Sequence, residues 1–199
     1  DNKPIKREYL EILLRSSKTV FSTKDAALLW KDSNEHNVAI RLGKYVKTGK
    51  LIRIRRGIYA KDKNYDRFEL ANCIYTPSYI SFETVLTRNG INFQFYSSIF
   101  VASYLTRSIK AGDQKISFIR MKNYVLSNTA GINHSNNISM ASKERAFLDR
   151  IYVNKNYYFD NLNPLDWNKV FDILPIYNNK KMEKKVKQYF ENYKKEKNQ

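Results

Sequence analysis

Residues 33–60, SNEHNVAIRLGKYVKTGKLIRIRRGIYA, constrain the fold most, because the spacing of their apolar residues changes halfway along. In the first half the spacing is that of one helix face, with apolar residues at Val38, Leu42, Tyr45 and Val46. Ser33 or Asn34 can cap the start of this helix, and Gly49 can end it because glycine adopts left-handed geometry at little cost. We therefore expect a helix with one buried face.

The second half predicts a β-hairpin, because its apolar residues recur with a period of two. Ile52 and Ile54 alternate with arginines, and Arg56-Gly57 supplies a two-residue turn in which Gly57 reaches positive φ cheaply. A turn of this length would place Tyr59 opposite Ile54, on the same face of the hairpin.

Side chains outside these apolar faces are mostly basic, which is typical of elements that bind duplex DNA. Because asparagine pairs bidentately with adenine and arginine with guanine, we expect major-groove contacts from Asn37, Arg41 and Lys44. We expect phosphate contacts from Lys47, Thr23 and Lys24. The hairpin arginines would lie over the neighbouring backbone or the minor groove: Arg53, Arg55 and Arg56. The alternative is an amphipathic helix and hairpin whose cations are only solvated.

The residues before this helix favour the DNA-binding interpretation. A helical pattern over residues 4–16 is followed by a β-prone run at 19–21 and by a second helix that Ser22 or Thr23 would cap. Helix, short extended piece, helix, turn, helix and hairpin is the order of a winged helix-turn-helix. The first sixty residues contain fourteen Lys and Arg against six Asp and Glu, a net charge of +8.

The charge of the whole chain also indicates a polyanionic partner. Its 199 residues include 36 Lys and Arg against 19 Asp and Glu, for a net charge of +17. Each phosphate that such a chain neutralises releases condensed counterions. Solvation alone explains the lysines near the C-terminus, and an AT-rich genome would also enrich lysine. The hairpin arginines are therefore a stronger indication than the total charge.

Composition also bears on location and on cofactors. No apolar run approaches the roughly 20 residues that cross a bilayer, and residues 1–10 have no apolar signal region. The single cysteine, Cys73, excludes an internal disulfide and a multi-cysteine zinc site. We expect a cytoplasmic protein with no membrane association, no metal and no cofactor.

A polar, aperiodic stretch at residues 61–64 suggests a domain boundary. We therefore expect an α+β protein with two domains, a winged helix-turn-helix over residues 1–62 and a mixed α/β domain with a helical C-terminal end over residues 63–199. In the second domain we expect strands at 98–105 and 115–121, with a third at 124–126. Further expectations are a polar loop at 133–137 and a last helix from about residue 180. This helix would carry one apolar stripe, formed by Met182, Val186, Tyr189, Phe190 and Tyr193.

Three segments carry a family resemblance. Residues 40–60 are similar to the pattern rL.k.G.i.rv.rGvYa, residues 77–86 to PSYISfetaL, and residues 141–149 to a.pEKAllD. In this order they resemble the AbiEi family, antitoxins of type IV toxin–antitoxin (abortive infection) systems. The chain departs from the family where Lys143 replaces a frequent proline and Arg145 replaces the usual lysine.

The resemblance implies two activities. The winged N-terminal domain would bind inverted repeats in the promoter of its own operon and repress it. The C-terminal domain would counteract a partner nucleotidyltransferase toxin, with or without direct contact. Only the first activity has independent support from the chemistry of the residues.

Two other functions remain open. One is a stand-alone winged-helix regulator that uses residues 63–199 for dimerisation or for a ligand. The other is a metal-dependent nuclease, because Asp113-Gln114-Lys115 resembles a D/E-x-K element and Glu83 is a distant carboxylate. The triplet follows a glycine turn instead of interrupting an apolar strand, and His36 and His134 are isolated in sequence. We therefore do not expect an enzyme.

Overall fold

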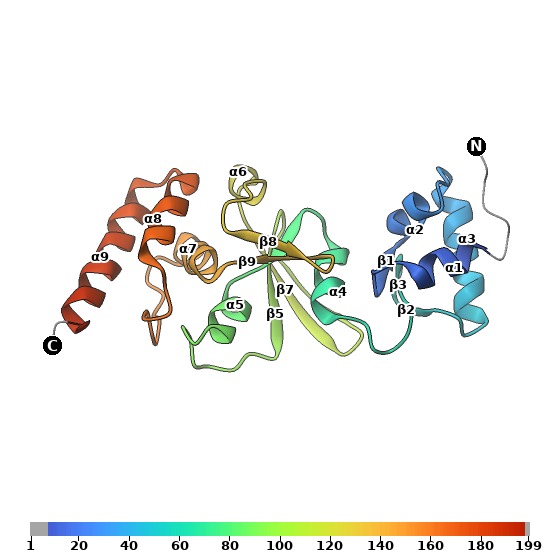
Figure 1. The fold of residues 1–199 in the computed structure, drawn as a ribbon, viewed down its shortest axis with the longest axis horizontal. Coiled ribbons are helices and arrows are strands. Elements are labelled where there is room, and N and C mark those ends of the chain that lie inside the picture. Colours follow the sequence, from blue (N-terminus) through green and yellow to red (C-terminus); the bar gives the residue numbers. More distant parts are fainter. Residues whose placement is uncertain (1–7, 198–199) are drawn as a thin grey trace. The chain divides into compact units, whose positions relative to one another are not determined.

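The computed structural model describes residues 8–197, with side chains from Tyr9 onward, and forms two compact units (Figure 1). The first consists mainly of residues 8–76 and the second mainly of residues 77–197. The described residues form nine α-helices, one 3-10 helix and two sheets, so the expected α+β class is confirmed. The boundary at residues 62 and 63 stays a prediction. Among the described residues no helix is both long enough and apolar enough to span a membrane.

The first unit combines four helices with a small antiparallel sheet. Its elements are α1 (Glu8–Arg15), β1 (Val20–Ser22), α2 (Thr23–Leu29), α3 (Glu35–Lys47), β2 (Ile52–Arg55), β3 (Ile58–Ala60) and α4 (Arg67–Ile74). The strand order is β1-β3-β2, with β3 antiparallel to both neighbours. Residues 4–7 of the first predicted helix lie outside the described residues.

The core of the first unit lies between α1, α2 and α3. Trp30 is fully buried at its centre, where its ring meets Tyr9 edge-on at 5.2 Å and its Nε1 donates to the Tyr9 carbonyl at 2.7 Å. Val38 and Leu42 of α3 are fully buried in the same cluster. The predicted buried face of this helix is therefore confirmed.

The register of the β2–β3 hairpin differs from the prediction. Tyr59 pairs with Arg53 and not with Ile54, while Ile58 pairs with Arg55 at the turn. A β-bulge between Arg53 and Arg55 inserts Ile54 as an extra residue, which shifts the register by one. The expected Tyr59–Ile54 pairing is therefore wrong, because turn length fixes the register only of an unbulged ladder.

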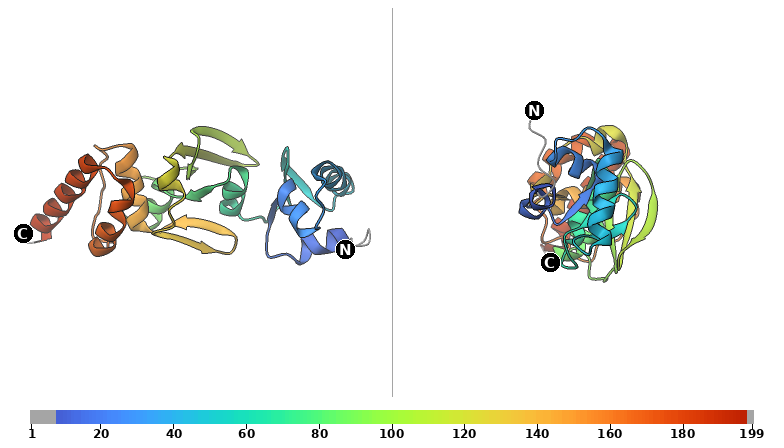
Figure 2. Two further views of the ribbon diagram at one scale, coloured as in Figure 1. Left: turned by 90° about the horizontal axis from the view of Figure 1, so that it is seen from above. Right: turned by 90° about the vertical axis from the view of Figure 1, so that its right-hand side faces the viewer.

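The second unit is built around a six-stranded mixed sheet with the order β6-β7-β5-β4-β9-β8. Its strands are β4 (Ser78–Ile80), β5 (Ser98–Ser103), β6 (Arg107–Ala111), β7 (Gln114–Arg120), β8 (Ile132–Ser135) and β9 (Ile138–Ala141). Its helices are α5 (Glu83–Arg88), α6 (Asn123–Leu126), α7 (Lys143–Val153), α8 (Trp167–Ile173), the 3-10 helix η1 (Leu174–Tyr177) and α9 (Lys180–Lys197). Figure 2 shows the β6–β7 and β8–β9 hairpins at opposite edges of this sheet.

Two local predictions in this unit are wrong. Residues 124–126 form part of helix α6 instead of a strand. Residues 133–137 form the end of strand β8 and a hairpin turn instead of a loop, because Asn136 and Asn137 both adopt positive φ and make the two-residue turn before β9. The strands expected at 98–105 and 115–121 are present as β5 and β7.

A buried ion pair joins two of the three segments that carry the family resemblance. Arg145 and Asp149 of α7 are fully buried, with Arg145 Nε 3.2 Å from Asp149 Oδ1. Asp149 also accepts hydrogen bonds from Ser81 at 2.7 Å, from Tyr177 at 2.7 Å and from Tyr79 at 3.2 Å. The remaining Arg145 nitrogens donate to the Tyr79 hydroxyl and to carbonyls of residues 125, 128 and 130. Both charges are therefore fully hydrogen-bonded inside the unit.

The last helix buries the apolar stripe that its spacing predicts. Met182 and Val186 are fully buried, and the Trp167 ring of α8 lies 5.0 Å from Phe190 and 5.5 Å from Tyr193. The lysines of α9 lie mostly on its exposed side.

Candidate nucleic-acid interface

Helix α3 begins at a well-formed cap. The Asn34 side chain accepts hydrogen bonds from the amides of His36 and Asn37, both at 3.1 Å. Glu35 lies in the first turn, and Lys44 and Lys47 lie in the last, so the charges complement the helix dipole. This helix is therefore a stable support for the side chains that it exposes.

The face of α3 opposite its buried stripe is exposed over its whole length. It carries His36, Asn37, Ile40, Lys44 and Lys47. Three of these are expected contact residues, Asn37, Lys44 and Lys47. Ile40, which is 48% exposed at the middle of this face, was not expected from the sequence. Its spacing in the sequence could have placed it there, since it lies three residues after Asn37 and four before Lys44.

Arg41 lies on a different side of α3 from this exposed face. Its side chain is only 25% exposed, and its Nη1 lies 3.4 Å from Asp32 Oδ2. Its guanidinium also stacks on the Tyr9 ring, 3.8 Å from the centroid, and lies 5.2 Å from the Trp30 ring centroid. Arg41, which we expected to contact the major groove, therefore connects α3 to α1 and to the α2–α3 turn.

Arg53 connects the hairpin to the exposed side of α3. Its guanidinium lies 5.7 Å from the centroid of the Tyr59 ring, the residue that the bulge sets opposite it. Its Nη2 is 3.7 Å from the position that a Cβ on Gly43 would occupy. The absence of a large side chain at Gly43 therefore leaves room for an arginine from β2 to lie against the helix.

Arg53 and Arg56 also line a shallow hollow of about 450 Å³ between the hairpin, α3 and the start of α2. Thr23 and Ala39 contribute the walls from the two helices. Arg56, at the hairpin turn, is exposed, whereas Arg55 is half-buried. Thus two of the three hairpin arginines converge with Thr23 on one concavity.

The start of α2 is already capped. Ser22 and Asp25 form a reciprocal capping box, and the Thr23 amide donates to the Gly57 carbonyl at 3.0 Å. Asp25 also pairs with Lys18 at 2.7 Å. These backbone amides therefore do not form an open anion site, and the polar groups available there are the Thr23 hydroxyl and the exposed Lys24.

The charge along this surface has one sign. Residues 36–57 contain seven Lys and Arg and no Asp or Glu. Of these, Arg41 forms an ion pair with Asp32, which precedes α3. The exposed α3 face and the hairpin arginines together define what we call the basic surface: Asn37, Ile40, Lys44, Lys47, Arg53 and Arg56.

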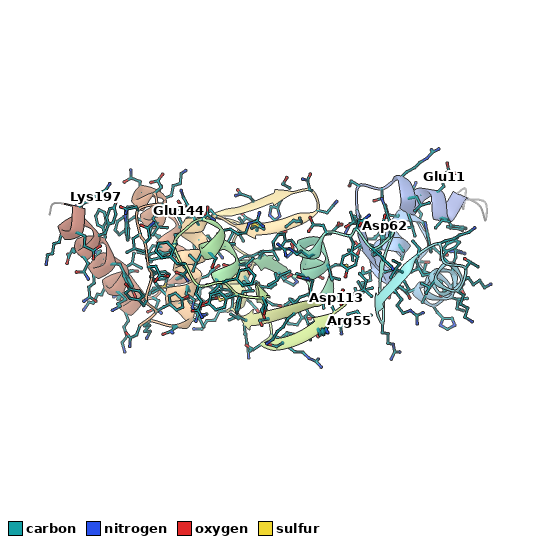
Figure 3. The ribbon with its side chains drawn as sticks, turned by 90° about the horizontal axis from the view of Figure 1, so that it is seen from below. Glu11, Arg55, Asp62, Asp113, Glu144 and Lys197 are labelled. Carbon is teal, nitrogen blue, oxygen red and sulfur yellow. The ribbon has the colours of Figure 1, made fainter. Side chains whose placement is uncertain are left out.

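The residues of the alternative metal site do not form a cation site. Glu83 is buried and pairs with Arg150 at 3.1 Å, so its charge is already compensated. Asp113 lies exposed on the turn between β6 and β7 (Figure 3). His134 Nδ1 lies 2.9 Å from Ser139 Oγ. Over residues 8–197 no group of three or more His, Cys, Asp or Glu is placed to hold a metal ion.

Cys73 has the environment of a half-buried, neutral thiol. Burial, together with the nearby Asp25 carboxylate, raises the pKa of Cys73 to about 12. Because the thiolate is the nucleophile, this environment disfavours a reactive role.

Neither a scan against protein-family models nor a search of curated proteins finds a match to this chain.

Proposed function

We propose that the chain is a DNA-binding regulator whose first unit acts as a winged helix-turn-helix. In this proposal α2 and α3 are the helix-turn-helix and the β2–β3 hairpin is the wing. The observation that carries it is the position of Arg53, whose Nη2 lies 3.7 Å from where a Cβ on Gly43 of α3 would be and which lines one hollow with Ala39 of α3 and Arg56 of the hairpin. Both elements can then bind one duplex at the same time.

Each residue of the basic surface has a chemical role in this proposal. Asn37 can pair with adenine, and Ile40 can contact the methyl group of thymine. Lys44 lies on the same face and reaches a guanine edge or a phosphate. Lys47, Arg53 and Arg56 would hold phosphates, with Arg53 and Arg56 on the strand next to the groove. Thr23 and Lys24 would add phosphate contacts beside the hairpin turn.

Arg41 has a positioning role here and not a groove contact. Its ion pair with Asp32 and its stacking on Tyr9 hold α3 against α1 and the α2–α3 turn. A guanidinium engaged in this way would have to break both interactions before it could reach a base.

We further propose that the chain is a cytoplasmic antitoxin of the AbiEi type. Support comes from the resemblance of residues 40–60, 77–86 and 141–149, whose segments contribute to the hairpin of the first unit and to the buried ion pair of the second. In this proposal the first unit represses the chain's own promoter at inverted repeats, and the second counteracts a nucleotidyltransferase toxin.

DNA binding is tested by fluorescence anisotropy with a duplex from upstream of the coding sequence. Lys44→Ala should weaken binding by about 1–3 kcal/mol if it contacts a base. Lys63→Ala, an exposed lysine outside the basic surface, is the matched control and should bind as the wild type does. Equal effects of the two substitutions would contradict the assignment of the surface.

The antitoxin role is tested separately, by inspecting the adjacent reading frames for a nucleotidyltransferase and co-expressing it with this chain. We expect the full chain to restore growth, and Lys44→Ala to restore it too when both genes are driven from a foreign promoter. Failure of the full chain to restore growth would leave a stand-alone regulator.

A further inference from the structure

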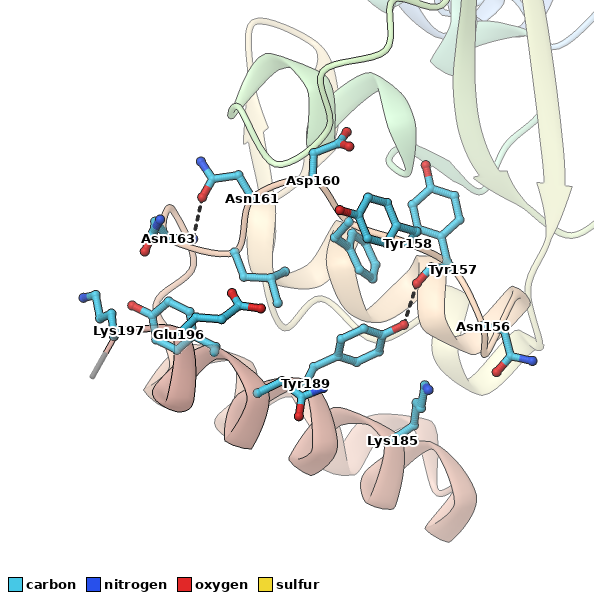
Figure 4. A pocket seen from close by; sticks show the side chains of 14 residues that line it. Asn156, Tyr157, Tyr158, Asp160, Asn161, Asn163, Lys185, Tyr189, Glu196 and Lys197 are labelled. Atoms are coloured by element: carbon cyan, nitrogen blue, oxygen red, sulfur yellow. Dashed lines mark hydrogen bonds between the residues drawn. The ribbon is translucent and has the colours of Figure 1, made fainter. Parts of the chain in front are cut away.

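A pocket of about 600 Å³ lies in the second unit, between α9 and the loop that joins α7 to α8 (Figure 4). Figure 4 shows loop residues 156–163 facing the side of α9 that carries Lys185, Tyr189 and Lys197. The pocket belongs entirely to the second unit and contains none of the basic surface. It is therefore independent of the proposed operator contacts.

The loop wall of this pocket is fixed by hydrogen bonds. The Tyr189 hydroxyl donates to the Tyr157 carbonyl at 2.5 Å, and Asn161 Nδ2 donates to the Gly90 carbonyl at 3.1 Å. The Asp160 carboxylate accepts from the Phe93 amide at 2.8 Å. The pocket is therefore preformed, and a ligand would not have to order the loop.

Aromatic rings and free amide groups face the pocket. Tyr158 is 79% exposed although it is a large aromatic residue, and Tyr193 lies on the opposite wall. The side-chain amides of Asn156, Asn163 and Asn192 make no hydrogen bond within the described part of the chain. Exposed rings stack on the π-faces of bases, and amides pair with base edges.

Cations lie at both ends of the α9 wall. Lys185 lies over the Tyr189 ring at 5.2 Å and Lys197 over the Tyr193 ring at 5.3 Å. They are twelve residues apart, about 18 Å along the helix. Helix α9 contains eight lysines and three glutamates, a net charge of +5. This charge favours a polyanionic ligand over a neutral peptide or sugar.

We propose that this pocket binds single-stranded nucleic acid. A base stacks on Tyr158, the asparagine amides contact base edges, and Lys185 and Lys197 hold phosphates along α9. The carboxylates of Asp160 and Glu196 also line the pocket, so phosphates lie along the lysines and not inside. A carboxylate inside can accept from the amino group of cytosine.

The test uses the full chain and fluorescein-labelled single strands of about 12 nucleotides, a length within the site sizes of single-strand binding folds. One strand is RNA and one is DNA, both of mixed sequence. The measurements are made in an Asn37→Ala, Lys44→Ala background, which removes two contacts of the basic surface. Binding that persists there and that Tyr158→Ala weakens belongs to the pocket, and failure of duplex binding does not affect it.

Tyr158→Ala should weaken single-strand binding about fivefold or more, because stacking on one ring contributes about 1–3 kcal/mol per base. Phe95→Ala removes an aromatic ring that is 85% exposed outside the pocket, and it should leave the affinity unchanged. Lys185→Ala should reduce the slope of log affinity against log salt by about 0.7. Lys187→Ala, an exposed lysine of α9 outside the pocket, should leave that slope unchanged.

Binding of RNA alone would support the proposal with the 2′-hydroxyl as a recognised group, and binding of both strands would support it without that group. Absence of binding by either strand would overturn it, as would equal losses in Tyr158→Ala and Phe95→Ala. If Tyr158→Ala instead abolished toxin neutralisation while single-strand binding stayed intact, the pocket would be a protein-docking surface and the proposal would be wrong.

Discussion

Asp32 and Arg41 form an ion pair with 3.4 Å between nitrogen and oxygen, and this pair distinguishes two kinds of basic residue on α3. Arg41 is turned toward Tyr9 and Trp30, whereas Lys44, less than one turn further along, is exposed. One residue therefore holds the helix in place and the other is available to a ligand.

Arg41→Ala should lower the free energy of unfolding by about 1–2 kcal/mol, because it removes a half-buried ion pair and a cation–π contact. It should weaken binding to all duplexes alike, without relaxing the choice of any one base. Urea unfolding and anisotropy with two unrelated duplexes measure both effects. Lys44→Ala is the control, with little change in stability and a selective loss of affinity. An unchanged free energy of unfolding in Arg41→Ala would refute the proposal that Arg41 holds α3 against α1.

Gly43 should tolerate alanine but not a large side chain. Gly43→Ala places a Cβ at 3.7 Å from the flexible end of Arg53, an ordinary contact, and should stabilise the chain by about 0.5–1 kcal/mol through lower backbone entropy in the unfolded state.

Gly43→Leu should displace Arg53 from α3. We expect the slope of log affinity against log salt to fall by about 0.9 for duplex DNA, as it should in Arg53→Ala. Combining the two substitutions should give no further loss. Additive losses would show that Arg53 and Gly43 act separately.

Asp25 should make the first unit sensitive to acid. Burial disfavours its charge, but hydrogen bonds from Lys18 and Ser22 outweigh burial and hold the pKa of Asp25 below its ordinary value of 3.8. A lowered carboxyl pKa contributes stability above the unfolded pKa and loses it as pH falls through the folded pKa.

Asp25→Asn should therefore cost about 1 kcal/mol at pH 7, through the capping box, and progressively less below about pH 4. Urea unfolding of both proteins at pH 7 and pH 3 measures this difference. Asp113→Asn, at an exposed turn position, is the control and should change neither value. A difference that grew at pH 3 would contradict the assigned pKa shift.

The buried ion pair of α7 should matter far more than an exposed pair of the same spacing. Arg145–Asp149 and Arg15–Glu11 are both four residues apart, but the first pair is fully buried and the second is exposed. Asp149→Asn leaves the Arg145 charge uncompensated and should destabilise the second unit by about 3–5 kcal/mol. Glu11→Gln should change stability by less than about 1 kcal/mol. Thermal unfolding of both variants gives the comparison, and similar values would refute it.

The sequence predicted most clearly what depends on local spacing. The buried face of α3, a cap at Ser33 or Asn34 and the stripe of α9 follow from apolar period and capping chemistry, and the structure has them, with Asn34 as the cap. The hairpin at residues 132–141 was missed because its strands are short and polar. Their pairing depends on two asparagines at positive φ more than on alternation.

The rest depended on contacts between distant residues. Spacing places Arg41 outside the apolar stripe, but only the positions of Tyr9 and Asp32 show that it faces other parts of the unit. The alternating sequence of β2 likewise gives no indication of the bulge at Ile54. In the pocket, the exposure of Tyr158 depends on where α9 lies, which no local pattern determines.

The Arg145 guanidinium has one further consequence. It stays protonated at every physiological pH, so the chain cannot neutralise it while the second unit assembles. Its partners come from residues 79, 125, 128, 130 and 149, and no subset of these satisfies all of its donors. A partly folded second unit would bury the Arg145 guanidinium without all of its hydrogen-bond partners. Folding intermediates should therefore leave this side chain in water, and closure around it should be a late, all-or-none event.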